Sequence, residues 1–225
     1  MVKTLSFYEY AGIIAPGVAF LFGLFFVSPE LEAVFLQEGF TVGDLGLFLL
    51  VSYVVGHLVA ALGNLLEAAY WKLHGGKPST WVLRPGERLV SNVQVEKLDR
   101  MLGPQLDMAL PPVRQMARKQ WEHIFMQVTV CVRRRKADDR AEIFNAVYSL
   151  SRGVAAALLA VAATNAWLHW ERWQTTLGAL LLFAIALYRM HRFGVHYGRT
   201  MLREFLDLPE RPGSVAKEEA EAAEQ

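Results

Sequence analysis

The chain has little cysteine, because Cys131 is the only thiol in 225 residues. A single cysteine excludes an internal disulfide framework and a zinc site built from several thiolates. The sequence also lacks a glycine-rich phosphate loop, a His-Glu-x-x-His pair and a Ser-His-Asp arrangement with supporting context. We therefore expect no metal ion, no cofactor and none of the common catalytic constellations.

Charged residues are also scarce, at 20% of the chain against 53% hydrophobic residues. A soluble domain of this length is usually more polar. The apolar excess is concentrated in four runs of about membrane-span length, near residues 10–27, 45–66, 153–170 and 173–188. The sequence therefore predicts an all-α, polytopic membrane protein with four transmembrane helices. The first run is expected to be a retained span rather than a cleaved signal.

Lysine and arginine are absent between Ser28 and Asp44, whereas residues 72–152 and the residues after Tyr188 are rich in them. By the positive-inside rule, the N-terminus, the central segment and the C-terminus are expected in the cytoplasm. The predicted order is a transmembrane hairpin (1–71), a helical cytoplasmic segment (72–152), a second hairpin (153–188), a basic cytoplasmic helix (189–213) and an acidic disordered tail (214–225).

The central segment carries several local helix signals. Residues 75–88 are rich in turn formers, and Ser91 is a plausible cap for the helix that follows. The Pro111-Pro112 pair predicts a further helix start. Asp138 and Asp139 are expected to cap a helix that runs directly into the third span.

The second span carries polar side chains at helical spacing, in alternating steps of four and three. Three interpretations are open: hydrogen bonds between helices of one bundle, a pore or lipid-accessible cavity, and a catalytic or metal site. We call this predicted feature the polar seam. Its residues are Ser52, Tyr53, Gly56, His57, Asn64 and Glu67, with Asn165 from the third span.

Two groups of basic residues flank the apolar runs, and both have two interpretations. They can hold anionic lipid headgroups, or they can bind an anionic ligand such as a nucleotide. Nucleic acid is not an expected partner. The first group is Arg133, Arg134, Arg135 and Lys136, and the second is Arg189, Arg192, His196, Arg199 and Arg203.

The stretches FYEYAGIIAPGVAFLFGLFF (residues 7–26) and GHLVAALGNLLE (residues 56–67) resemble uncharacterised bacterial four-span inner-membrane proteins. In architecture alone, the layout also resembles small membrane subunits of bacterial anti-phage systems. That resemblance implies a bacterial inner membrane and a cytoplasmic part that senses a partner or nucleotide. It transfers no functional residues.

These patterns favour a non-enzymatic, self-associating membrane module, either a channel-like effector or a membrane sensor and scaffold for a cytoplasmic protein partner. The alternative is a membrane-embedded enzyme that uses His57, Asn64 and Glu67, for example in lipid modification. A second enzymatic alternative rests on Arg189 and His196, whose separation by six residues fits the loose pattern of HEPN ribonucleases.

Overall fold

The computed structural model describes residues 10–28, 41–86, 89–135 and 139–209. Every regular element in these ranges is a helix, and four helices are long and apolar enough to cross a membrane. The expected all-α fold with four span-length apolar helices is thus confirmed. The chain divides into two compact units, and each is described by itself. Unit 1 comprises Met1–Leu73 and Asn145–Phe193, and unit 2 comprises His74–Phe144 and Gly194–Gln225.

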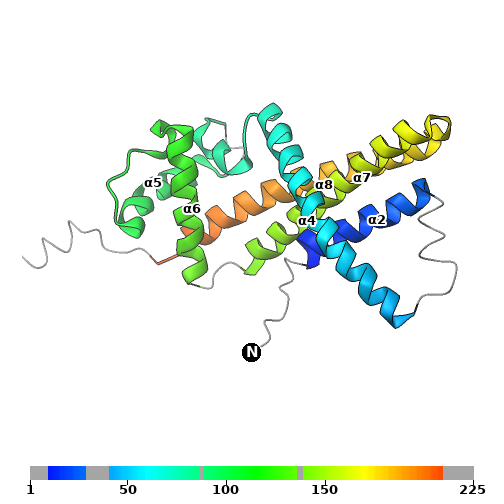
Figure 1. The fold of residues 1–225 in the computed structure, drawn as a ribbon. Coiled ribbons are helices and arrows are strands. Elements are labelled where there is room, and N and C mark those ends of the chain that lie inside the picture. The colour runs from blue at the N-terminus through cyan, green and yellow to red at the C-terminus, as the bar shows by residue number, and fades with distance from the viewer. Residues whose placement is uncertain (1–9, 29–40, 87–88, 136–138, 210–225) are drawn as a thin grey trace, which may run out of the picture. The chain divides into compact units, whose positions relative to one another are not determined.

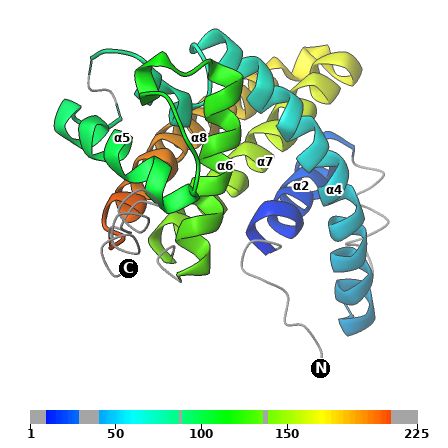
Figure 2. The same cartoon turned by 90° about the vertical axis from the view of Figure 1, so that its left-hand side faces the viewer.

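Unit 1 contains the apolar helices. A short π-helix, η1, leads into α2, whose first turn contains Pro16. Figures 1 and 2 show α2 packed against the long helix α4. The bounds are η1 (Tyr10–Ile14), α2 (Ala15–Val27), α4 (Val42–Leu73), α7 (Asp139–Leu168), η4 (Trp170–Arg172) and α8 (Trp173–Leu206), of which α7 and α8 also contribute to unit 2.

Small residues allow the helices of unit 1 to approach closely. A Cβ atom on Gly17 would collide with the backbone of Ser52, and one on Gly56 would collide with the carbonyl group of Ile13. Gly153 is likewise covered by the ring of Pro16. Such contacts are typical of membrane helices, where close packing rather than the hydrophobic effect drives association.

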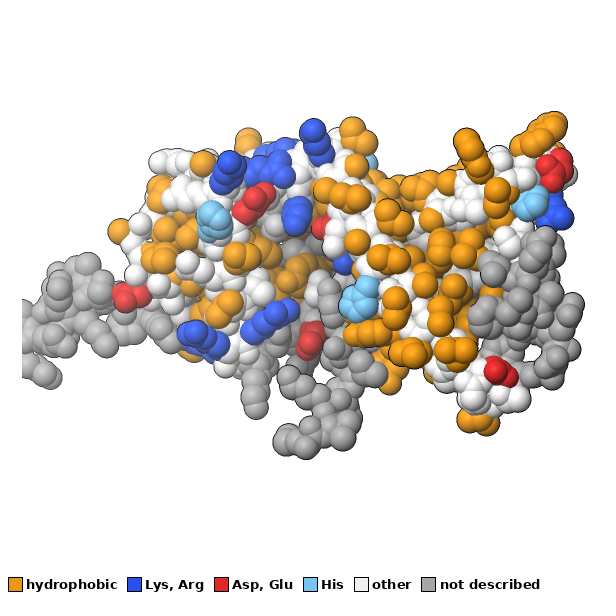
Figure 3. All heavy atoms as spheres, in the orientation of Figure 1, with side chains coloured by type: hydrophobic (Ala, Val, Ile, Leu, Met, Phe, Trp, Pro, Cys, Tyr) orange, Lys and Arg blue, Asp and Glu red, His pale blue; other side chains and the backbone are white. Residues whose placement is uncertain are grey.

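The outer surface of unit 1 is apolar. Hydrophobic side chains crowd the face over α2 and α4 in Figure 3. Long aliphatic side chains such as Leu58 and Leu65 on α4 and Leu181 and Ile185 on α8 are exposed. A soluble protein rarely exposes a large contiguous apolar surface, whereas the lipid-facing side of a transmembrane bundle does so as a rule.

Unit 2 has a conventional hydrophobic core. Helix α5 (Asn92–Leu106) begins with a capping box in which Ser91 and Gln94 exchange side-chain and backbone hydrogen bonds, as the cap expected at Ser91 requires. Helix α6 (Arg118–Arg134) turns Trp121, Ile124 and Val128 inward. The remaining elements are η2 (Pro78–Leu83), η3 (Val113–Gln115) and the ends of α7 and α8.

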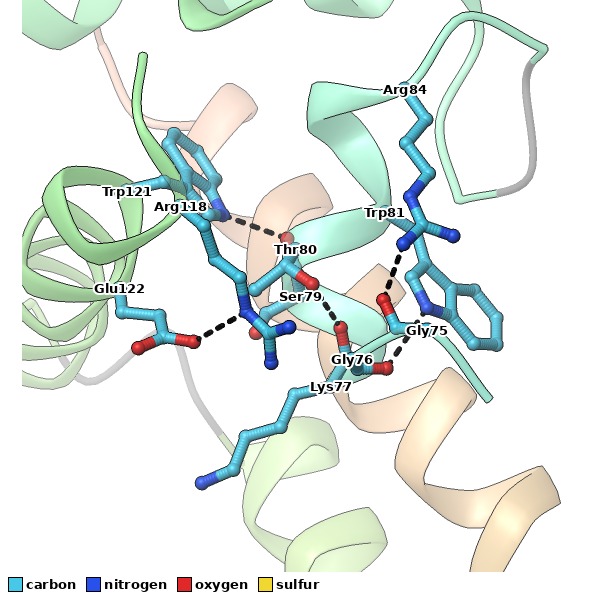
Figure 4. A network of polar contacts seen from close by, with 10 residues as sticks. All are labelled: Gly75, Gly76, Lys77, Ser79, Thr80, Trp81, Arg84, Arg118, Trp121 and Glu122. Atoms are coloured by element: carbon cyan, nitrogen blue, oxygen red, sulfur yellow. Dashed lines mark hydrogen bonds and ion pairs between the residues drawn. The ribbon is translucent and has the colours of Figure 1, made fainter. Parts of the chain in front are cut away.

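Hydrogen bonds from indole and guanidinium groups hold η2 and the residues before it in place within unit 2 (Figure 4). The buried Trp121 donates from Nε1 to the carbonyl oxygen of Ser79 at 2.8 Å. Trp81 donates from Nε1 to the carbonyl oxygen of Gly76 at 3.0 Å, and Arg84 donates to that of Gly75. Both glycines have positive φ, which side chains disfavour. The turn-rich stretch, as far as Gly86, is therefore a folded part of unit 2.

Some boundaries differ from the expected ones. Helix α6 begins at Arg118 rather than at Pro111-Pro112, because the extended backbone at Pro112 is followed by the short helix η3. Helix α7 begins at Asp139 and continues into the third span without a break, as expected. Asp138, and the tail from residue 210 onward, lie outside the described residues. The basic helix expected at 189–213 is the end of α8, which stops at Leu206.

Candidate functional site

The buried face of α4 consists of residues spaced by three or four, and Ser52, Gly56, Gly63 and Glu67 among them are small or polar. From one end to the other it contains Phe48, Ser52, Gly56, Val59, Gly63, Glu67 and Trp71. Three members of the predicted polar seam, Ser52, Gly56 and Glu67, therefore lie on the inner side of unit 1.

The other members of the seam on α4 lie on its outer side. The side chains of Tyr53, His57 and Asn64 are exposed. The rings of Tyr53 and His57 meet edge to face, with centroids 4.8 Å apart. The structure thus divides the predicted stripe into an inner and an outer group, because the closest backbone contacts are made by Gly56 and Ser52, which lie about 100° and about 140° around the helix axis from His57.

Asn165 links the second pair of apolar helices. Its side-chain Nδ2 donates to the carbonyl oxygen of Arg172, at 3.0 Å, and to Oγ1 of Thr176, at 2.9 Å. The residue is fully buried, and it joins α7 to η4 and α8 where the chain reverses direction. Hydrogen bonds of this kind between helices are a common use of asparagine in membrane proteins.

A largely buried ion pair joins α4 to α7 in unit 1. Arg152 Nη1 lies 2.5 Å from Glu67 Oε2, and the two side chains are only 15% and 12% exposed. Tyr148, one turn before Arg152, hydrogen-bonds to the same carboxylate and accepts a 2.8 Å hydrogen bond from Trp71 Nε1. A buried carboxylate requires such compensation, because desolvation of an unpaired charge is expensive.

A histidine on α8 continues this cluster. Nδ1 of His191 lies 3.0 Å from the hydroxyl of Tyr70, and its ring packs against Trp71 with centroids 5.3 Å apart. The end of α4 is therefore tied to both α7 and α8 by polar and aromatic contacts. The buried Glu67 carboxylate is already held by a guanidinium and a phenol, so this cluster is suited to joining helices rather than to general-base chemistry.

The first basic group is spread over two hollows of unit 2. Arg133 lines one hollow together with His123, Met126 and Tyr197. Arg134 and Arg135 line the other, where Arg135 donates to the buried Gln105 at 3.2 Å. Lys136 lies outside the described residues.

Most members of the second basic group are engaged by their own unit. Arg189 lies over the ring of Phe193, at 5.5 Å, and His196 stacks on Phe144, with centroids 5.4 Å apart. Arg199 donates to the carbonyl oxygen of Leu89 at 3.1 Å. Arg192 and Arg203 are exposed.

Arg189 and His196, the two residues of the ribonuclease pattern, do not face a common site. They lie two turns apart on one continuous helix, which corresponds to a rise of about 10 Å. The His196 ring is stacked on a phenylalanine, and the Arg189 guanidinium lies on another. In the part of the chain that the structure describes, no group of three His, Cys, Asp or Glu side chains is placed to hold a metal ion.

Sequence reasoning missed the pairing of Glu67 with Arg152, because 85 positions separate them. A signal was present. Arg152 immediately precedes the third apolar run, and Glu67 lies at the end of the second. Charges at the ends of apolar helices usually reach the interface, but charges that face the bundle interior require a partner of opposite sign.

No protein-family model matches this chain, and comparisons with curated proteins and with solved structures give no match.

Proposed function

We propose that this chain is a non-enzymatic membrane module that associates with copies of itself through the outer polar face of α4. In this proposal unit 1 spans the bacterial inner membrane, and unit 2 lies in the cytoplasm, as do both termini. Unit 2 then serves as a scaffold or sensor surface for a cytoplasmic partner. The positive-inside distribution of lysine and arginine supports this orientation.

The observation that carries the proposal is the exposure of His57 and Asn64. Both lie on the outer side of α4, where the other exposed residues near them are Tyr53 and several valines, leucines and alanines. Polar side chains in hydrocarbon turn toward protein or water, because contact with lipid leaves their hydrogen-bonding groups unsatisfied. Since the single chain leaves these groups on its surface, the same face of a second copy can bury them in a two-fold symmetric interface.

The inner side of the same helix supports a scaffold more than an enzyme. Glycine contacts close the interface between α2 and α4, and the Glu67–Arg152 pair secures α4 to α7. These contacts join the helices of unit 1 and use the Glu67 carboxylate, whereas Ser52 Oγ, Arg152 Nε and Asn165 Oδ1 stay buried without a hydrogen-bond partner. A bundle whose helices are joined in this way and that still presents polar groups outward is suited to assembly.

The test is the mass of the purified full-length chain in nanodiscs for wild type and for the double variant His57→Leu with Asn64→Leu. Interhelical polar contacts contribute about 1 kcal/mol each, so losing both pairs across an interface should shift a weak oligomer to monomer. The control is Leu181→Ala with Leu182→Ala, which alters exposed leucines on α8 and should leave the mass unchanged.

A monomeric wild-type chain at all concentrations would contradict self-association. An oligomer that persists in the double variant would place the interface elsewhere. The channel-like form of the proposal requires one further result. The wild-type oligomer should conduct ions in planar bilayers, and the double variant should lose that conductance.

A further inference from the structure

Helix α6 has two faces, and only one of them is used by the core. Trp121, Ile124, Val128 and Val132 point inward and are buried. On the opposite side the exposed residues are Lys119, His123, Met126, Val130 and Arg133, again in steps of three and four.

The middle of this outer stripe is apolar and its ends are basic. Met126 is 64% exposed and Val130 is 48% exposed, whereas Lys119 begins the stripe and Arg133 and Arg134 end it. Figure 3 shows Lys and Arg side chains at both ends of α6, with hydrophobic, His and acidic side chains between them. The stripe is about 21 Å long from Lys119 to Arg133.

The acidic residue nearest to the stripe on α6 is already paired. Glu122 accepts from Arg118 Nε at 3.1 Å, in an i,i+4 pair on the helix surface. The hollow that His123 and Arg133 line includes these two basic side chains and no carboxylate, whereas the hollow that Val130 and Arg134 line also includes Asp107. The surface is thus apolar in the centre and positive at its edges, which is the pattern of helices that lie in the headgroup region of anionic bilayers.

From this pattern we propose that the outer stripe of α6 docks on the surface of an anionic lipid bilayer, with Met126 and Val130 inserted and Lys119, Arg133 and Arg134 bound to headgroup phosphates. The inference rests on the proposed orientation of the chain in the membrane but not on self-association.

The chain connections make the bilayer a more suitable occupant than a soluble protein. Unit 2 is connected to the apolar helices at His74, through α7 and through α8. A surface tethered in this way experiences a high effective concentration of lipid, and weak electrostatic attraction of about 1 kcal/mol per basic residue is then sufficient.

The first experiment uses full-length wild-type protein in nanodiscs and needs no substitution. Hydrogen exchange of the backbone from His123 to Arg133 is compared between zwitterionic and anionic lipid. Slower exchange in anionic lipid, reversed by high salt, is the expected result. Equal exchange in both lipids would overturn the proposal.

The second experiment places a fluorescent label on the stripe. In a Cys131→Ser background, Met126→Cys carries the dye, and Val93→Cys on α5 is the control because Val93 is 72% exposed and lies outside the stripe of α6. Brominated anionic lipid should quench the dye at 126 several-fold more than at 93, and Arg133→Glu with Arg134→Glu should abolish the difference.

Two outcomes would overturn the bilayer as the occupant. Equal quenching at the two positions means that the stripe does not touch lipid. If quenching of the dye at position 126 falls as the protein concentration rises and does not depend on lipid charge, a second copy of the chain covers the stripe. Because the mass measurement reports self-association separately, failure of one proposal does not decide the other.

Discussion

At the scale of single residues, the buried Glu67–Arg152 pair and the exposed Arg118–Glu122 pair provide a matched comparison. Glu67→Gln leaves Arg152 buried without its counter-charge, and removal of one partner from a buried pair costs about 3–5 kcal/mol. Unfolding of the detergent-solubilised protein, followed by circular dichroism, should show this loss.

The control for that prediction is Glu122→Gln. Its partner Arg118 is 55% exposed and Glu122 is 43% exposed, so the change should cost less than about 1 kcal/mol. A double change of Glu67 and Arg152 to leucine should recover most of the lost stability, because it removes both desolvation penalties. Equal effects of the two single substitutions would mean that the Glu67–Arg152 pair is hydrated.

Glycine substitutions give a second comparison at this scale. Gly56→Ala should push η1 away from α4, because the added methyl group collides with the backbone carbonyl group of Ile13, which cannot rotate away. Gly178→Ala on α8 meets no atom within 4 Å and should stabilise the helix by about 0.5–1 kcal/mol. Thermal melts of both variants in one detergent test the prediction, which fails if Gly56→Ala melts like wild type.

The residue scale also shows where sequence reasoning reached its limit. The polarity of His57, Asn64 and Glu67 suggested one common face, but the structure places Glu67 inside and the other two outside. In a membrane the protein interior and the lipid are both apolar, so hydrophobicity does not identify the buried face. Steric fit at Gly17 and Gly56 identifies it instead, and that fit is visible only when both helices are placed.

At the scale of elements, local signals were more informative. The cap at Ser91 and the continuity of α7 into the third span are recognisable in the sequence, because capping and helical periodicity depend on neighbours along the chain. The start of α6 was not predicted, because η3 depends on a contact from another element. Asp99 on α5 accepts a hydrogen bond from the backbone N–H of Val113 at 2.6 Å.

A prediction at the same scale concerns the hydrogen bond that attaches η2 to α6. Trp121→Phe keeps a buried aromatic ring at this position but removes the indole N–H that donates to the carbonyl oxygen of Ser79. An orphaned buried acceptor costs about 1–3 kcal/mol, so hydrogen exchange in residues 78–83 should become faster. Trp170→Phe, at an exposed position in η4, is the control and should leave that exchange unchanged.

At the scale of the whole molecule, the proposed topology follows from two independent features. If all four apolar helices span the membrane, the two ends of the chain lie on the same side. The lysine and arginine residues at 72–152 and beyond Tyr188 predict that this side is the cytoplasm. Val42 at the start of α4 and Arg172 in η4 should then lie on the outer side, whereas Glu96 on α5 should lie inside. All three side chains are exposed.

Single cysteines at these positions, in a Cys131→Ser background, distinguish this arrangement from its alternatives. In intact spheroplasts a membrane-impermeant maleimide should label Val42→Cys and Arg172→Cys, and Glu96→Cys should react only after lysis. If α8 entered the membrane without crossing it, Arg172→Cys would still be labelled, but a cysteine at the exposed Arg203 would be labelled as well. Labelling at 203 only after lysis therefore shows that the fourth helix crosses completely, which is the condition for unit 2 to be assembled from both of its segments on one side of the membrane.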